Sequence, residues 1–255
     1  MSSGMGMFAM PGRLGFLPFV FALLASPNAV QAACVDTTNL ARSTVSIVRH
    51  FDDAERERFP DLIGIQGSAW FLSPTTIVTV EHVTAAMMLS VDNWKMLEIV
   101  SEAGSQLIPA RIERLTGPQS ERLAVVELQG AVSGAQSAAI RREPLAPEEQ
   151  VVTLAYPAGR RQLVQGRFVR FGDGGKLSGM ALLELFEGEN RLVIDHGASG
   201  APVVDCEGRV AAVVSNVFTQ SFHWAYREIR YTTAWGMPNV VSVPIDALPD
   251  VSENR

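Results

Sequence analysis

Short hydrophobic runs recur along the chain and are separated by Gly, Pro, Asp or Ser. They are rich in Val, Ile, Leu and Thr, and many such runs with turn residues between them indicate an all-β sandwich or barrel. The predicted strands cover residues 43–48, 69–72, 76–80, 123–128, 151–155, 163–169, 192–194, 210–214 and 240–243. Helical periodicity is weak, and the best candidate helix, residues 84–89, follows a predicted strand.

The pattern changes between Gly130 and Gln150, where small and polar residues dominate and two prolines interrupt the chain. Such a stretch is typical of a connection between structural units. It predicts two halves of similar size, residues 33–140 and residues 141–255.

The first 32 residues contain no acidic residue and one basic residue, Arg13, followed by an apolar run from Leu14 to Ala25 and small residues up to Ala32. An apolar run of about 12 residues is shorter than the 20 or so that span a bilayer, and this order of features is typical of a secretory signal peptide. We expect cleavage after Ala32, export to the periplasm or the extracellular space, and no stable membrane anchor afterwards. An uncleaved anchor and a lipid attached to Cys34 are the alternatives.

Composition limits the partners. The chain has 255 residues, 47% hydrophobic and 19% charged, which is typical of a globular protein. Its net charge is −6 and it has no run rich in Lys or Arg, so nucleic acid is not expected as a partner. Two cysteines without clustered histidines make a poor metal site, and we expect neither a metal nor a cofactor. The oligomeric state is left open.

The two cysteines, Cys34 and Cys206, are a candidate disulfide if the protein is exported to an oxidising compartment. The bond would join the start of the mature chain to a segment far along the sequence. Two independent buried thiols are the alternative.

Two stretches carry candidate chemistry. In DHGASGAPVVDCEG, small residues surround Ser199, which fits either a tight surface turn or a nucleophile whose backbone amides must come close to a substrate. His82 comes just after the predicted strand at 76–80. A histidine at a strand end is rigidly held yet open to a cleft, as a general base must be.

Four segments, in chain order, resemble the trypsin-like (chymotrypsin-fold) serine proteases, and the secreted bacterial heat-shock and glutamyl-endopeptidase-like branches are the most similar. The segments are residues 67–83 around His82, LAVVEL at 123–128, YPAGRRQLVQG at 156–166, and GASGAP at 197–202 with the hairpin that follows it. Residues 243–246 add a weaker match. The resemblance covers residues 43–248 and implies two packed six-stranded antiparallel β-barrels, with His82 on the first and Ser199 on the second.

The resemblance also implies roles for these residues. Ser199 would attack the substrate carbonyl, and His82 would accept its proton. The backbone N–H groups of Gly197 and Ser199 would form an oxyanion hole for the charge that develops on that carbonyl. The substrate would be a protein or a peptide.

The chain departs from the family at the third catalytic position. The aspartate expected before LAVVEL is replaced by Arg122, which cannot accept a hydrogen bond from imidazole. Glu121 precedes it, and Glu81 stands beside His82. Either Glu121 is the acid, or Glu81 pairs with Arg122 and leaves a Ser–His dyad. If Arg122 occupies the acid's place, replacing it with Asp raises hydrolysis.

The resemblance assigns candidate substrate contacts. Val193 lies at the base of the primary pocket, where it favours a small or medium apolar side chain, although plain strand core is an equal alternative. His196 lies on the pocket rim, where a solvent-exposed loop histidine is the alternative. Residues Ser215, Asn216 and Val217 match the strand along which substrates pair.

Two functions follow. The first is a secreted serine endopeptidase that uses Ser199, His82 and Glu121. The second is a catalytically impaired member of the family that binds proteins without cutting them, because Arg122 stands where the acid is expected.

Overall fold

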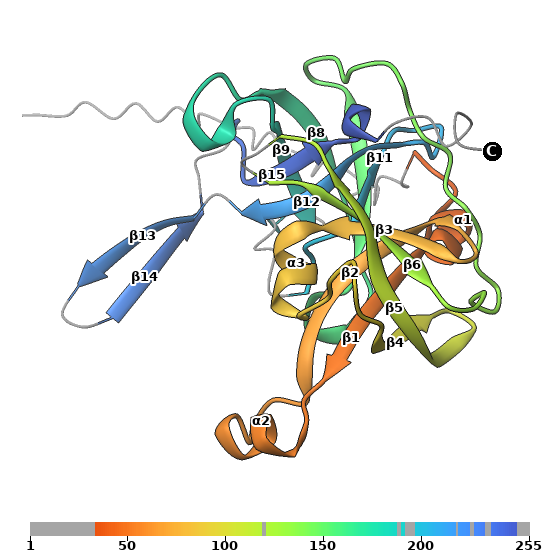
Figure 1. The fold of residues 1–255 in the computed structure, drawn as a ribbon. Helices are drawn as coiled ribbons and strands as arrows, with labels where there is room; N and C mark the ends of the chain where they lie inside the picture. The colour runs from red at the N-terminus through yellow and green to blue at the C-terminus, as the bar shows by residue number, and fades with distance from the viewer. Residues whose placement is uncertain are drawn as a thin grey trace, which may run out of the picture. The chain divides into compact units, whose positions relative to one another are not determined.

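The computed structural model describes residues 34–118, 121–187, 190–191, 197–217, 219–224, 227–232 and 236–248 (Figure 1). The chain divides into one unit of residues 1–31 and a second unit of residues 32–255. The predicted signal peptide therefore lies outside the described residues. Among the helices that are described, none is long and apolar enough to cross a membrane.

The first half of the chain forms a closed antiparallel barrel in the order β1-β2-β3-β6-β5-β4. Its strands are β1 (Thr44–His50), β2 (Gly64–Ser73), β3 (Thr76–Val80), β4 (Lys95–Ser101), β5 (Gly104–Thr116) and β6 (Leu123–Leu128). The hairpin of β2 and β3 continues into α3 (Glu81–Ala86), and β3 pairs along its whole length with β6. Residues 129–149, all of them described, form neither helix nor strand before the second barrel begins.

The second barrel follows the order β10-β9-β15-β12-β11-β7-β8, and an additional pairing of β8 with β9 closes a ring of six strands. The strands are β7 (Gln150–Ala155), β8 (Gln162–Phe171), β9 (Ala181–Glu187), β10 (Asn190–Arg191), β11 (Pro202–Val204), β12 (Val210–Val217) and β15 (Val240–Pro244). A separate two-stranded sheet contains β13 (Thr219–Trp224) and β14 (Arg227–Thr232). The two six-stranded antiparallel barrels that the sequence predicts are present.

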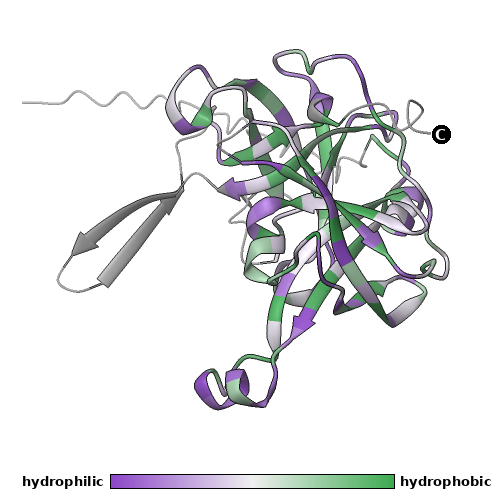
Figure 2. Ribbon diagram, viewed as in Figure 1, coloured by the Kyte–Doolittle hydropathy of each residue, from purple (hydrophilic) through white to green (hydrophobic). Residues whose placement is uncertain are grey.

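One hydrophobic core joins the two barrels. Trp70, Phe71 and Leu97 of the first barrel belong to the same buried cluster as Leu154 and Val213 of the second. A smaller cluster fills the second barrel alone. Figure 2 shows the hydrophobic residues along the barrel strands, whereas α2 (Asp53–Arg58) is largely hydrophilic. Because burying apolar surface is the main favourable term in folding, the shared cluster holds the facing edges of the barrels together.

The short helices depend on local contacts. Asp52 and Glu55 form a capping box at the start of α2, and Asp36 caps α1 (Thr37–Ser43). The part of the chain that the structure describes also contains the 3₁₀ turns η1 (Pro157–Gly159), η2 (Gly175–Leu177) and η3 (Ile245–Ala247).

The structure corrects the expected helix at residues 84–89. Helix α3 begins at Glu81, immediately after β3, because the polar residues that end the apolar run of the strand form its first turn. An acidic residue is favourable at that end of a helix. The predicted strands do not include β4, β5, β9, β10, β11, β13 or β14, and the predicted strand at 192–194 lies outside the described residues.

A disulfide joins Cys34 to Cys206 across 172 residues, as the sequence predicted, with a Cα–Cα distance of 5.0 Å. That distance lies within the usual range for a disulfide. The bond attaches the segment that precedes α1 and the first barrel to the second barrel, next to the end of β11. It therefore reinforces covalently the junction that the shared core forms.

Candidate active site

His82 lies in the first turn of α3, where the buried strand β3 ends. Its Nδ1 is 2.9 Å from Glu121 Oε2, and its backbone N–H donates to Glu121 Oε1 at 3.2 Å. Because a carboxylate only accepts, Nδ1 carries a hydrogen in this contact, and in the neutral imidazole Nε2 is then an acceptor. The side chain of Glu121 is 15% exposed and that of His82 is 45% exposed, so the acid is shielded and the ring remains accessible.

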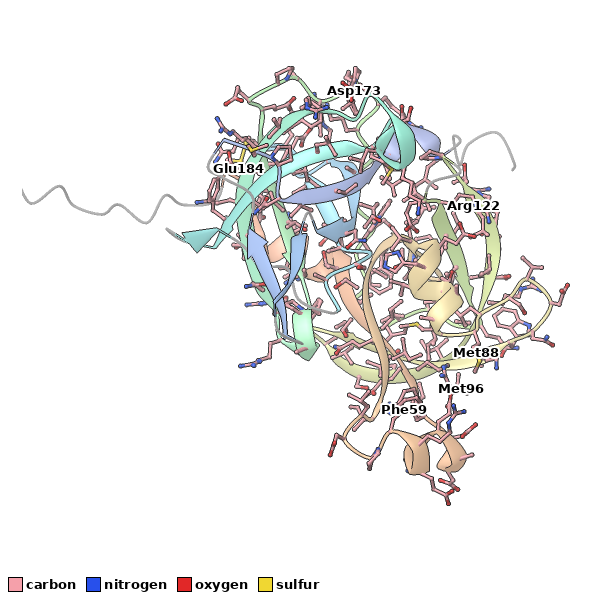
Figure 3. The ribbon with its side chains drawn as sticks, turned by 90° about the vertical axis from the view of Figure 1, so that its left-hand side faces the viewer. Phe59, Met88, Met96, Arg122, Asp173 and Glu184 are labelled. Carbon is pink, nitrogen blue, oxygen red and sulfur yellow. A yellow bond between two sulfur atoms is a disulfide. The ribbon has the colours of Figure 1, made fainter. Side chains whose placement is uncertain are left out.

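A second pair runs beside the first. The Glu81 N–H donates to the backbone oxygen of Arg122 at 2.8 Å. The Arg122 guanidinium donates back to the Glu81 carboxylate, with Nε 2.7 Å from Oε2 and Nη2 bonded to Oε1. Figure 3 labels Arg122 beside the start of α3. The hydrogen bonds from Arg122 lower the pKa of Glu81, so that its carboxylate stays charged in mildly acidic solution.

The two pairs join two short segments that run in opposite directions. Consecutive residues of α3, Glu81 and His82, contact Arg122 and Glu121 in reverse order on the segment before β6. Arg122 therefore faces Glu81 and not the imidazole. Both contacts that the sequence left open are present together, and the carboxylate on the His82 ring comes from Glu121, whereas the Arg122 side chain pairs with Glu81.

Ser199 lies in a tight loop, residues 197–201, that leads into β11. Its hydroxyl donates to the backbone oxygen of Ser215 at 2.9 Å. Gly197 and Gly200 on either side have positive φ angles of +101° and +93°. At Gly200, an added Cβ would lie 1.9 Å from the backbone oxygen of Ser68, so only glycine allows this approach.

The backbone N–H groups of Gly197 and Ser199 lie in the loop that carries Ser199. Among the residues that the structure describes, neither N–H group has a hydrogen-bond acceptor. Two backbone donors one residue apart in a tight loop can stabilise an anionic oxygen.

Ser215 on β12 connects the two halves of the site. Its backbone oxygen accepts from Ser199, and its own hydroxyl donates to Glu121 Oε2 at 3.3 Å. Within the described residues, no hydrogen bond joins His82 to Ser199 directly, and the Ser199 hydroxyl donates to Ser215. In structures without substrate, catalytic hydrogen bonds are often long or unformed, and a rotation about Cα–Cβ redirects a serine hydroxyl.

The remaining sequence candidates are placed unevenly. Asn216 and Val217 form the end of β12, where the strand pairs with Val241 and Val240 of β15. Val193 and His196 lie outside the described residues. In the part of the chain that is described, no group of three or more His, Cys, Asp or Glu residues could hold a metal ion.

One residue at the site was not singled out from the sequence. The hydroxyl of Ser68 on β2 donates to the Gly197 backbone oxygen and accepts from the Tyr156 N–H. The backbone N–H of Ser68 donates to the backbone oxygen of Ser199. Serine at a strand position in the sequence gave no sign of these contacts, because its partners are remote along the chain.

The family model of the trypsin-like peptidase domain matches residues 67–213. Two solved structures share the fold at 16% sequence identity. The inactive form of the Rv3671c protease has a TM-score of 0.53 over 87% of this chain and 91% of that chain. The active form of the Rv3671c protease from M. tuberculosis has a TM-score of 0.52 over 92% and 89%. No curated protein matches the sequence.

The close contact at Gly200 predicts the effect of adding a methyl group. Gly200→Ala should lower the free energy of unfolding by about 2–4 kcal/mol, because both backbone strain and a clash with Ser68 arise. Gly104→Ala is the matched control, since Gly104 also has positive φ but no atom lies within 4 Å of its added Cβ. It should cost only the conformational penalty of about 1–2 kcal/mol. Denaturant unfolding measures both, and equal losses would contradict the close approach.

Proposed function

The chain belongs to the family of trypsin-like peptidase domains, and we propose that it is a serine endopeptidase that cleaves protein or peptide substrates with Ser199 and His82. The observation that carries the proposal is the arrangement around Ser215. This residue contacts both the carboxylate that orients His82 and the hydroxyl of Ser199. Ser215 thereby links the proposed nucleophile on one side to the proposed acid on the other.

The proposed reaction begins when the Ser199 hydroxyl turns from Ser215 toward Nε2 of His82. His82 accepts the proton as Oγ attacks the substrate carbonyl, and the resulting oxyanion accepts hydrogen bonds from the amides of Gly197 and Ser199. His82 then gives the proton to the leaving amine. Water, activated in the same way by His82, releases the acyl group from Ser199.

Glu121 is the proposed acid. Its carboxylate would hold the Nδ1–H tautomer and stabilise the imidazolium that forms during attack. Glutamate is one methylene longer than aspartate, which fits an acid that reaches His82 from the residue before the usual position. The Glu81 carboxylate neutralises Arg122, so that no unpaired cation opposes the imidazolium.

The proposed substrate path follows β12. This strand pairs with β11 up to Val213 and continues beyond it, past the Ser199 hydroxyl. We propose that Ser215, Asn216 and Val217 pair with the substrate backbone, that Val193 selects a small or medium apolar side chain, and that His196 lies on the rim. The disulfide and the apolar N-terminal segment support the further proposal that the protein works outside the cytoplasm.

A fluorophosphonate probe, which labels activated serines covalently, tests the proposal. The wild-type protein should be labelled and should hydrolyse an unstructured protein such as casein, whereas Ser199→Ala should do neither. Ser43→Ala is the control, because Ser43 is a buried serine of α1 outside the site. A folded wild-type protein that neither reacts nor hydrolyses would instead support a family member that binds without cutting.

The role of Glu121 predicts a large loss of rate. Glu121→Gln removes the negative charge while keeping the shape of the side chain, and kcat/KM for a peptide substrate should fall about 10²–10⁴-fold. Glu98→Gln is the matched control, because Glu98 also contacts a histidine, with its Oε2 2.6 Å from His50 Nε2, but outside the candidate site. That variant should keep full activity. An active Glu121→Gln enzyme would exclude Glu121 as the acid.

The pairing of Glu81 with Arg122 predicts a rescue. Glu81→Gln should lower kcat/KM about three- to tenfold, because it leaves an unpaired cation near the imidazolium. The double variant Glu81→Gln/Arg122→Gln should recover most of that loss, since the cation is gone. Arg122→Asp should lower activity, not raise it, because it places a carboxylate against Glu81. A double variant worse than Glu81→Gln would show that the pair itself is required.

A further inference from the structure

Ser68 lies where three segments meet. It is a fully buried residue of β2 in the first barrel. Its hydroxyl donates to the Gly197 backbone oxygen at 2.7 Å and accepts from the Tyr156 N–H at 3.0 Å. Gly197 belongs to the loop of residues 197–201 that carries Ser199, and Tyr156 precedes η1 in the second barrel. One hydroxyl thus bridges two backbone groups of the second barrel from a position in the first.

The backbone of Ser68 adds two further contacts. The Ser68 N–H donates to the backbone oxygen of Ser199 at 2.8 Å, and the backbone oxygen of Ser68 accepts from the Thr79 hydroxyl at 2.8 Å. The backbone of Ser68 therefore holds the residue that carries the nucleophile, while its side chain holds the residue that carries one of the proposed oxyanion donors. Side-chain substitution removes the second role and leaves the first.

The Gly197 peptide needs such an anchor. Glycine lacks a Cβ, so few steric barriers fix its φ and ψ angles. Gly197 closely approaches the η1 segment, since an added Cβ would lie 2.7 Å from the Tyr156 oxygen. The next residue, Ala198, is buried and has no polar side chain to hold the loop. Among the described residues, the Ser68 hydroxyl is the group that hydrogen-bonds the Gly197 carbonyl.

We propose that Ser68 is a positioning residue for the reaction, whose hydroxyl fixes the Gly197 carbonyl and thereby aims the amides of Gly197 and Ser199 at the same substrate oxygen. This inference rests on the proposed function. Because Ser68 belongs to the first barrel, the geometry of the oxyanion hole depends on how the two barrels pack. Its burial excludes solvent from the position of the lost hydroxyl, so the paired groups would have to find new partners by moving.

Ser68→Ala tests the proposal through kcat and KM for a peptide substrate. Loss of one oxyanion donor costs about 10²–10³ in rate, and misaimed donors retain part of their effect. We therefore expect kcat to fall about 10- to 100-fold while KM changes less than about twofold. Ser68→Thr, which keeps the hydroxyl, should recover most of the rate.

A stability control separates positioning from loss of structure. Ser43→Ala removes another buried hydroxyl, which donates to the Leu40 oxygen at 3.0 Å in α1. It should lower stability without lowering kcat. A folded Ser68→Ala variant with wild-type kcat would overturn the proposal, as would equal losses of kcat in the two variants.

A binding measurement gives a second, independent test. A peptide aldehyde forms a tetrahedral adduct with an oxyanion, whereas the corresponding peptide alcohol cannot. Ser68→Ala should weaken inhibition by the aldehyde at least about tenfold and leave inhibition by the alcohol unchanged. If Ser68→Ala does not fold, Ser68→Cys replaces it, because a thiol is only a weak donor. An unchanged ratio of aldehyde to alcohol inhibition would overturn the proposal.

The wild-type enzyme distinguishes this failure from failure of the proposed function. If wild-type protein does not react with the fluorophosphonate or hydrolyse peptides, both ideas are wrong. If it is active and Ser68→Ala is equally active, the endopeptidase proposal stands and only the role of Ser68 is wrong.

Discussion

The close approach of β2 to the loop that carries Ser199 is the constraint on which the candidate site depends. The backbone of the first barrel contacts the backbone of the second, because the Ser68 N–H donates to the backbone oxygen of Ser199. The approach is possible because Gly200 has no side chain where Ser68 and Thr79 would meet it. A shared hydrophobic core brings the barrels together, but this contact fixes their register to within hydrogen-bond distances. The position of Ser199 relative to β3, and so to His82, follows from it.

The two ion pairs between the first turn of α3 and the segment before β6 show how a carboxylate can reach His82 although Arg122 occupies the family's usual acid position in the sequence. The carboxylate on His82 comes from Glu121, and the neighbouring Arg122 is paired with Glu81. Each charge in the group has an opposite partner, so neither the acid nor the cation is left unpaired beside the imidazole. Substituting any one of the four changes the electrostatics of the other three, because they lie on two short adjacent segments.

The sequence predicted the elements whose signals are local. Strands β3 and β6 begin and end where predicted, because both are short runs made mainly of Val, Ile, Leu, Thr or Ala between polar residues, with Glu127 as the one charged residue in them. Strands β4 and β5 were missed since charged residues alternate with their buried ones, and no continuous apolar run appears. The choice between Glu81 and Glu121 required the structure, because both lie close to the relevant residues in sequence. Ser68 was beyond sequence reasoning, since its hydroxyl partner Gly197 lies 129 residues away.

The pairing of Glu81 with Arg122 and of His82 with Glu121 limits which single substitutions leave the contacts intact. An aspartate at position 122 would restore the family's usual acid, but alone it would face Glu81 as a like charge. Loss of Glu81 alone would remove the carboxylate that pairs with Arg122, and loss of Glu121 alone would remove the carboxylate that contacts His82. Each of these single substitutions therefore breaks one of the two contacts. The four side chains act as one electrostatic unit, in which a change at one position removes the partner of another.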